Sequence, residues 1–126
     1  MSRHLRLRLP GTAIFFTVTL AGRGGSLLVD HVGLLKASVA QTRAERPFGI
    51  AACVVLPDHL HCIWTLPEGD TDYSTRWRLI KARFSRGLWV GARRESHVRR
   101  HELGIWQRRF WEHHIRDEED MAAHLH

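Results

Sequence analysis

Two histidines separated by one residue, His59 and His61, form the sharpest chemical pattern in the sequence. Side chains two residues apart on a β-strand point to the same face, so a strand here would place both imidazoles side by side. Neutral imidazole nitrogen is a common metal ligand, and Asp58 adds an acid beside the pair. Two such imidazoles could ligate one metal ion, and further ligands would have to come from other segments. Taken by itself, so common a spacing fits two plain surface histidines better.

A hairpin is expected to carry this pair. Residues 48–56 are apolar and rich in β-branched side chains, a Pro-Asp turn follows, and residues 59–66 resume a strand. In the second strand the histidines share a face with Ile63 and Thr65. The alternate residues are expected to point into the core: Leu60, Cys62, Trp64 and Leu66.

Alternation and helical spacing predict the elements on either side of the hairpin. Residues 13–20 alternate as a strand that is rich in aromatic and β-branched side chains. Asp30 is expected to cap a helix that ends before Pro47, and Ser74 or Thr75 is expected to cap a second helix. The apolar stripe of that second helix consists of Trp77, Ile80, Phe84 and Leu88.

The last part of the chain is expected to contain a connection, a strand and the beginning of a helix. Residues 90–103 are Arg-rich and unpatterned, which is typical of a loop. Residues 104–115 are interpreted as a strand, and the acids of residues 117–120 suit the first turn of a helix that is truncated at His126. The order β-α-β-β-α-β predicts an α+β fold of the ferredoxin-like, split βαβ type. Such a fold has one antiparallel sheet with helices on one face.

Length and composition bound the class of protein. The 126 residues fit one domain, 1–126, because they can bury one core but not two. With 44% hydrophobic and 25% charged residues, the chain is globular rather than disordered. No apolar run approaches the roughly 18 residues that cross a bilayer, and the N-terminus lacks the apolar segment of a signal peptide. Cys53 and Cys62 lie in apolar runs and are interpreted as buried free thiols, so we expect a cytoplasmic protein without a membrane partner.

Positive charge is concentrated in one part of the chain. The whole chain carries +6, but residues 76–109 alone carry +9, mostly from Arg, with tryptophans interleaved. The planar guanidinium of Arg binds phosphate oxygens bidentately, so the cluster favours a nucleic-acid partner over a solvated basic face. The candidate DNA-binding residues lie in an N-terminal arm, on the second helix, in the loop and near the last strand: Arg3, Arg6, Arg8, Arg76, Arg83, Arg93, Arg94, Arg99, Arg100, Arg108 and Arg109.

Two tryptophans of the last predicted strand region allow two interpretations. Trp106 and Trp111 could stack on unpaired bases, whereas a Trp on a strand is more often part of the core. For Trp111 we expect the core position.

Several blocks of the sequence resemble one family. VVLPDHLHCIWTLPEGD (54–70) resembles the hydrophobic-flanked His-hydrophobic-His, or HUH, signature of transposases that cut single-stranded DNA with one tyrosine. Three further blocks resemble one branch, the REP-associated tyrosine transposases: GTAIFFTVTLAGR (11–23), STRWRLIKARFSR (74–86) and GIWQRRFWEHHIRDEED (104–120). The blocks occur in the family's order and cover essentially the whole chain. The resemblance is therefore more specific than the histidine pair alone.

The resemblance implies an activity on DNA hairpins that carry a short adjacent single strand. It makes His59 and His61 the ligands of a divalent ion, Mg²⁺ or Mn²⁺, which polarises the scissile phosphate. A tyrosine on the last helix would attack, leaving a 5′-phosphotyrosine and a free 3′-hydroxyl. The resemblance also implies a monomer, with a dimer as the alternative.

The chain departs from the family pattern at its C-terminus. The nucleophilic tyrosine is expected beyond His126, together with the rest of its helix and the tail, so no catalytic residue is assigned within the chain. Tyr73 is the single tyrosine, and nothing in its spacing brings it to His59. Two alternatives stay open: an inactive module that binds DNA hairpins, and an RNA-binding domain of the same plan. The RNA-binding domain would expose aromatic residues in its middle strands, where this sequence exposes histidines.

Overall fold

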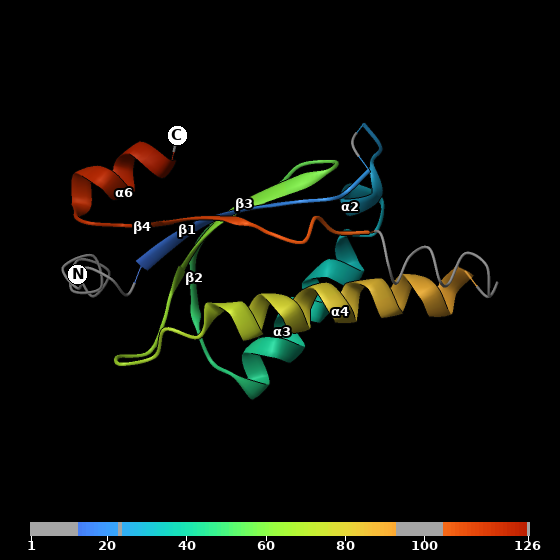
Figure 1. Cartoon of the computed structure of the whole chain (residues 1–126), viewed down its shortest axis with the longest axis horizontal. Coiled ribbons are helices and arrows are strands. Elements are labelled where there is room, and N and C mark those ends of the chain that lie inside the picture. The colour runs from blue at the N-terminus through green and yellow to red at the C-terminus, as the bar shows by residue number, and fades with distance from the viewer. Residues whose placement is uncertain (1–12, 23, 93–104, 126) are drawn as a thin grey trace.

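The computed structural model describes residues 13–22, 24–92 and 105–125. Its strands form one antiparallel sheet in the order β2-β3-β1-β4 (Figure 1). The strands are β1 (Ala13–Thr19), β2 (Gly49–Val55), β3 (His59–Thr65) and β4 (Trp111–His114). The helices are α2 (Leu27–Asp30), α3 (Val32–Glu45), α4 (Tyr73–Ala92) and α6 (Glu118–Leu125). The predicted α+β class is confirmed, and none of these helices is long and apolar enough to cross a membrane.

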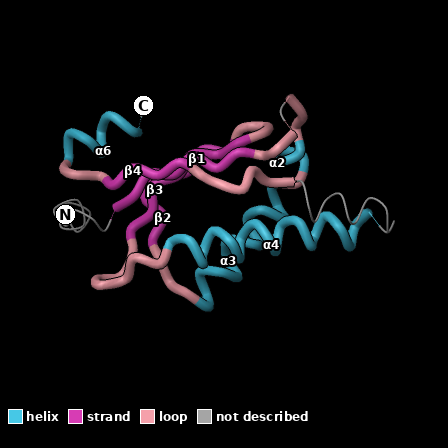
Figure 2. The backbone as a smooth tube through the Cα atoms, viewed as in Figure 1, coloured by secondary structure: helices cyan, strands magenta, loops and turns pink. Residues whose placement is uncertain are grey.

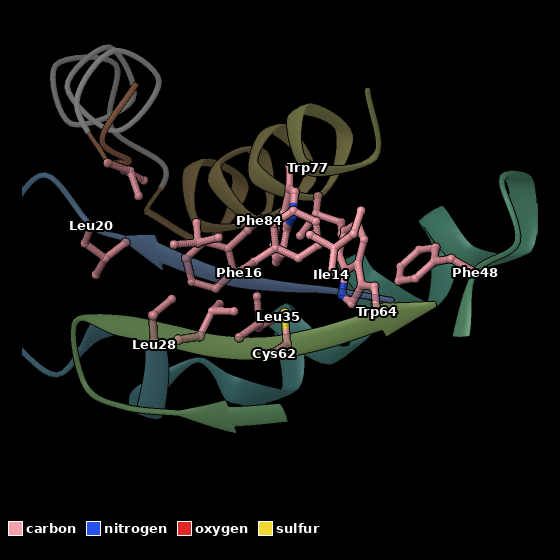
Figure 3. Close-up of a cluster of buried hydrophobic side chains, with 14 of the residues drawn as sticks. Ile14, Phe16, Leu20, Leu28, Leu35, Phe48, Cys62, Trp64, Trp77 and Phe84 are labelled. Atoms are coloured by element: carbon pink, nitrogen blue, oxygen red, sulfur yellow. The ribbon is translucent and has the colours of Figure 1, made fainter. Parts of the chain in front are cut away.

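The main core lies between the sheet and the two long helices. α3 and α4 lie together on one side of the sheet (Figure 2). Side chains from β1, β3 and α4 meet between these layers, and the rings of Trp64 and Trp77 stack with centroids 4.4 Å apart (Figure 3). The predicted stripe of α4 is buried in full, which explains why α4 is held against the sheet: Trp77, Ile80, Phe84 and Leu88.

α6 lies on the opposite side of the sheet from α3 and α4 (Figure 1). It adds a small second core made of Ala13, Ile63, Ile115 and Met121. Ile63 belongs to the outward set of β3 but is only 1% exposed. α6 therefore covers one end of this second face, and the histidine end, where both rings are half-buried, stays accessible.

The strand register aligns side chains of three strands on the face that α3 and α4 leave uncovered. β1 pairs with β3 so that Thr17 lies opposite His61 and Thr19 opposite His59. On its other edge β1 pairs with β4, where Thr17 lies opposite Trp111. His61, Thr17 and Trp111 consequently form one row across the sheet, and we call this side of the sheet the open face.

The predicted helix caps are both wrong by a few residues. Asp30 lies inside the short helix α2, and α3 begins only after His31. α4 begins at Tyr73 because the carboxylate of Asp72 accepts the Thr75 backbone N–H at 3.1 Å. Asp72 lies two or three residues before the predicted caps and accepts one of the first N–H groups of α4, which is the usual function of a cap.

α4 also continues to Ala92, through the first residues of the predicted loop. The remaining residues of that loop, 93–103, lie outside the described part of the chain. The predicted strand 104–115 is interrupted. Trp106 forms an isolated bridge with Leu20, the unpaired residues 108–110 follow, and β4 begins only at Trp111.

The two cysteines differ in exposure. Cys62 is buried as predicted, but Cys53 is exposed although it lies directly opposite Cys62 in the register of β2 and β3. β2 is the edge strand of the sheet, so its side chains have neighbours on one strand only. Both thiols are free.

Candidate functional site

The histidine pair lies at the accessible end of the open face. The ring centroids of His59 and His61 are 5.0 Å apart, and the ring planes are nearly perpendicular, at 81°. β3 creates this proximity because alternate residues of a strand share a face. The predicted side-by-side arrangement is therefore present.

Each imidazole of the pair is held at its Nδ1 atom. His59 Nδ1–H donates to Asp58 Oδ1 at 2.8 Å, and Asp58 Oδ2 accepts the Gly24 backbone N–H at 3.0 Å. His61 Nδ1 lies 2.9 Å from the hydroxyl oxygen of Thr17. Contacts at Nδ1 leave Nε2 as the nitrogen of each ring that can bind a metal. Asp58 orients His59 and ties it to the segment after β1.

Electrostatics favour the neutral form of His61. Partial burial lowers the pKa of His61 below its ordinary value, and the neighbouring His59 lowers it further. A neutral imidazole offers the lone pair that metal binding requires. Mg²⁺ and related hard ions take most of their ligands from oxygen. The pair therefore fits two positions of such a site, and the oxygens of a bound phosphate suit the others.

A second group of possible metal ligands lies on the same face. His113, Asp120 and His124 each offer a ligand atom, and these atoms lie within 4.8 Å of one another. His113 Nε2 lies 2.9 Å from Asp120 Oδ2, and the same oxygen accepts the Arg116 backbone N–H at 2.9 Å. The Arg116 N–H and the His113 contact hold the pKa of Asp120 at about 2. The group fastens α6 to β4 and has the composition of a cation site.

The sequence interpretation missed this second group. It treated the acids of residues 117–120 only as helix-starting charges. The available signal was the spacing of Asp120 and His124, which one helical turn brings together, with His113 on the preceding strand. The ring of Phe15 joins this group to the first pair, since its centroid lies 5.6 Å from His61 and 4.7 Å from His124.

Tyr73 lies on the other side of the sheet. Its ring packs on Phe16 and Phe110 in the main core, and its hydroxyl donates to Glu112. The hydrogen bond to Glu112, with some burial, raises the pKa of Tyr73 to about 12. The sheet separates this phenol from His61, which agrees with the expectation that Tyr73 does not serve the histidine pair.

Arg76, predicted to contact DNA, is a buried structural residue. It is only 2% exposed. Its guanidinium donates to both carboxylate oxygens of Asp70, at 3.1 and 2.9 Å, and to the backbone carbonyls of Arg46, Pro47 and Asp72. A phosphate could reach it only by displacing these partners. The prediction for Arg76 is therefore corrected: loops that the sequence pattern could not place fold over the first turn of α4.

The other basic residues predicted to contact DNA are less buried than Arg76 or lie outside the described residues. Arg83 is largely engaged, since it pairs with Glu45 at 2.6 Å and donates to the Thr42 hydroxyl at 2.8 Å. Arg108 and Arg109 are exposed in the unpaired stretch before β4. The remaining candidates lie outside the described residues: Arg3, Arg6, Arg8, Arg93, Arg94, Arg99 and Arg100.

The expectation for Trp111 is wrong. Trp111 is 53% exposed on the open face, whereas a core position was expected. Trp106 is the partly buried one: its indole N–H donates to the Lys81 carbonyl at 3.2 Å and its ring meets Phe84 edge-on. α4 covers Trp106, while no helix of the described part covers Trp111.

Comparisons with known proteins identify relatives along nearly the whole chain. No protein-family profile matches it. A REP-associated tyrosine transposase of Escherichia coli K12 is 42% identical over 99% of this chain and 68% of its own length. A Haemophilus influenzae protein described by the same family name is 41% identical over 99% of this chain and 72% of its own length.

The comparison with solved structures finds the same family as the comparison of sequences. A REP-associated tyrosine transposase bound to a REP hairpin superposes with a TM-score of 0.78 at 43% identity, covering 93% of this chain. The chain spans 64% of that transposase's length. A Deinococcus radiodurans protein assigned as a transposase shares the fold, with a TM-score of 0.63 at 15% identity over 88% of this chain. From its sequence and its fold, the chain belongs to the REP-associated tyrosine transposase family.

Proposed function

We propose that this protein binds DNA hairpins with an adjacent single strand, and that it forms the binding and metal-holding part of a strand-cleaving and rejoining enzyme. The histidine pair carries the proposal, because His59 and His61 are oriented at Nδ1 and leave both Nε2 atoms available. The relative that was solved with a REP hairpin supports a hairpin as the partner. A DNA partner also agrees with a cytoplasmic location.

The two histidines are the proposed ligands of Mg²⁺ or Mn²⁺. Such an ion, when bound, supplies Lewis-acid polarisation of the scissile phosphate. Asp58 and Thr17 keep the imidazoles oriented before DNA arrives, so less ordering is required on binding. The exposed Arg108 and Arg109 are proposed to contact phosphate, as are the predicted basic residues outside the described part.

The nucleophile is proposed to be a tyrosine that follows His126, on the continuation of α6. Its phenol oxygen would bond to phosphorus while the P–O3′ bond breaks, so the 5′-phosphate remains on the tyrosine and a 3′-hydroxyl is released. Tyr73 is unsuited to this step, because its hydroxyl donates a hydrogen bond to Glu112, which raises the pKa of the phenol, and the sheet separates it from His61. The alternative is a protein that binds DNA hairpins without cleaving them.

Incubation with a labelled hairpin oligonucleotide and Mn²⁺ tests the proposal. The chain of residues 1–126 is expected to retard the hairpin without forming a covalent adduct. A version that continues through a downstream tyrosine is expected to form the adduct. Equal affinity for RNA and DNA hairpins would instead favour an RNA-binding domain.

Substitution of the histidines tests their assignment in that extended version. His59→Ala and His61→Ala are expected to reduce metal-dependent cleavage and to leave hairpin affinity nearly unchanged. Loss of hairpin binding in either variant would argue against a metal-ligand role. Light scattering of the hairpin complex tests the proposed monomer, and a mass of two chains would favour the dimer.

A further inference from the structure

The exposed Trp111 is unusual because the other tryptophans with described side chains are covered. Trp64 and Trp77 are 1% and 2% exposed, and Trp106 is partly buried. Trp111 leaves 53% of its surface in water, at the start of the edge strand β4, where it lies opposite Thr17 of β1. A large aromatic side chain gains little stability for the fold from such a position, and exposed aromatic surface commonly marks a binding site.

Neighbouring rings fix the orientation of the indole. The Phe15 ring meets Trp111 edge-on, with centroids 5.7 Å apart. The His113 imidazole is parallel to the indole within 4°, with centroids 5.9 Å apart. A flat ring held in one orientation loses little conformational freedom when a second flat ring stacks on it.

The strand register places this ring near the histidine pair. Thr17 of β1 lies opposite both His61 and Trp111, so a single strand separates the two side chains. Strands lie about 4.8 Å apart, which puts the backbones of His61 and Trp111 about 10 Å apart. This distance is of the order of one nucleotide's own length. A DNA strand whose phosphate lies at the histidines thus has a base within reach of the indole.

Charge around Trp111 suits a nucleic-acid strand. Arg108 and Arg109 are exposed just before β4, whereas Arg116, just after it, pairs with Asp120 at 3.5 Å. The single acid of β4, Glu112, points to the opposite side, where it accepts the Tyr73 hydroxyl. An aromatic ring flanked by cationic side chains is the usual composition of a surface that binds single-stranded nucleic acid.

We propose that Trp111 is the stacking platform for one unpaired nucleobase of the single strand that adjoins the hairpin. This inference rests on the proposed function, and it adds a base-binding position that the histidine pair does not supply. Stacking tolerates any base, because every base has a π-face. Trp111 should therefore contribute affinity for the single strand without selecting its sequence.

Fluorescence anisotropy with two oligonucleotides tests the proposal. One is a bare DNA hairpin, and the other is the same hairpin with a short single-stranded tail. Trp111→Ala is expected to weaken binding of the tailed hairpin about 5- to 100-fold and to leave binding of the bare hairpin unchanged. Trp111→Phe, which keeps a smaller ring, is expected to lie between wild type and Trp111→Ala. Val29→Ala is the matched control, since Val29 is a comparably exposed apolar residue, at 47%, on α2.

Abasic sites identify the stacked nucleotide. Removing the base at one tail position should weaken the wild type to the level of Trp111→Ala, and Trp111→Ala should not respond to the same change. 2-Aminopurine at that position should be quenched by the wild type and not by Trp111→Ala.

The outcomes separate the two proposals. If wild type and Trp111→Ala bind the tailed hairpin equally, or if Trp111→Ala weakens both oligonucleotides alike, the stacking platform is wrong while hairpin binding stands. If the wild type binds neither oligonucleotide, the proposed function fails and the platform with it. If Trp111→Ala changes the oligomeric state instead of the affinity for DNA, the ring contacts a second copy of the chain, which also overturns the proposal.

Discussion

The two faces of the sheet use the same residue types for opposite purposes. On the covered side, Tyr73, Arg76 and Trp77 of α4 point toward the sheet or its loops, and each is covered or paired inside the protein. The open face holds His61 and Trp111, whose rings remain accessible. A reactive or basic side chain is thus available to a ligand only where no other element packs over it. Residue type alone is a poor guide to function in this protein.

The two faces should differ most in how much their side chains contribute to the free energy of unfolding. Phe16→Ala on the covered face is expected to lower the free energy of unfolding by about 3–5 kcal/mol, because it leaves a cavity in the core. Trp111→Ala on the open face should cost less than about 1 kcal/mol, since it loses only partial ring contacts. Urea denaturation of both variants measures the contrast. Equal costs would mean that Trp111 is a core residue after all.

Arg76 and Arg108 extend the comparison to basic residues, since Arg76 is buried and Arg108 is exposed. Arg76→Ala removes a buried guanidinium and leaves Asp70 and several carbonyls without their donor, so a loss of roughly 2–4 kcal/mol is expected. Arg108→Ala should change stability by less than about 0.5 kcal/mol but should flatten the salt dependence of DNA binding. Denaturation curves measure the stability of the two Arg variants, and salt titrations measure the salt dependence of their DNA binding. A flattened salt dependence in Arg76→Ala, measured where that variant is folded, would restore Arg76 as a phosphate contact.

Asp70 makes the same contact sensitive to pH. The Arg76 hydrogen bonds are the main cause that lowers the pKa of Asp70 from its ordinary 3.8 to about 2. A depressed folded-state pKa means that the contribution is complete above the ordinary value and is lost as the pH falls towards 2. Asp70→Asn should therefore destabilise the protein at pH 7, by less than Arg76→Ala. The difference from wild type should shrink between about pH 4 and pH 2. Urea midpoints across this range test the sign, and a pH-independent difference would contradict it.

Tyr73→Phe should produce the smallest change. It removes the hydroxyl that donates to Glu112 and keeps the ring in the core, so a loss of about 0.5–1.5 kcal/mol is expected. Hairpin affinity should not change, because Tyr73 and the histidine pair lie on opposite sides of the sheet. Anisotropy titration measures the affinity. A loss of binding or of covalent adduct in Tyr73→Phe would mean that this tyrosine serves the open face.

The candidate site was predictable where it depends on strand alternation. His59 and His61 share a face because a strand has a period of two, and that rule needs no knowledge of the rest of the fold. The second group of possible metal ligands could not be predicted in the same way. It consists of His113, Asp120 and His124. Its members come from a strand and a separate helix, and only the packing of α6 beside β4 brings their ligand atoms together.

The amino-acid sequence by itself determined the order of elements, the apolar stripe of α4 and the pairing of the two histidines, because these follow from local periodicity. The tertiary structure alone decided which side chains are covered. Arg76 is buried because Asp70 and the backbone around Pro47 close over it, and Trp111 is exposed because α6 covers only part of the open face. Burial depends on what packs against a face, and the spacing of residues within one strand or helix carries no information about that partner.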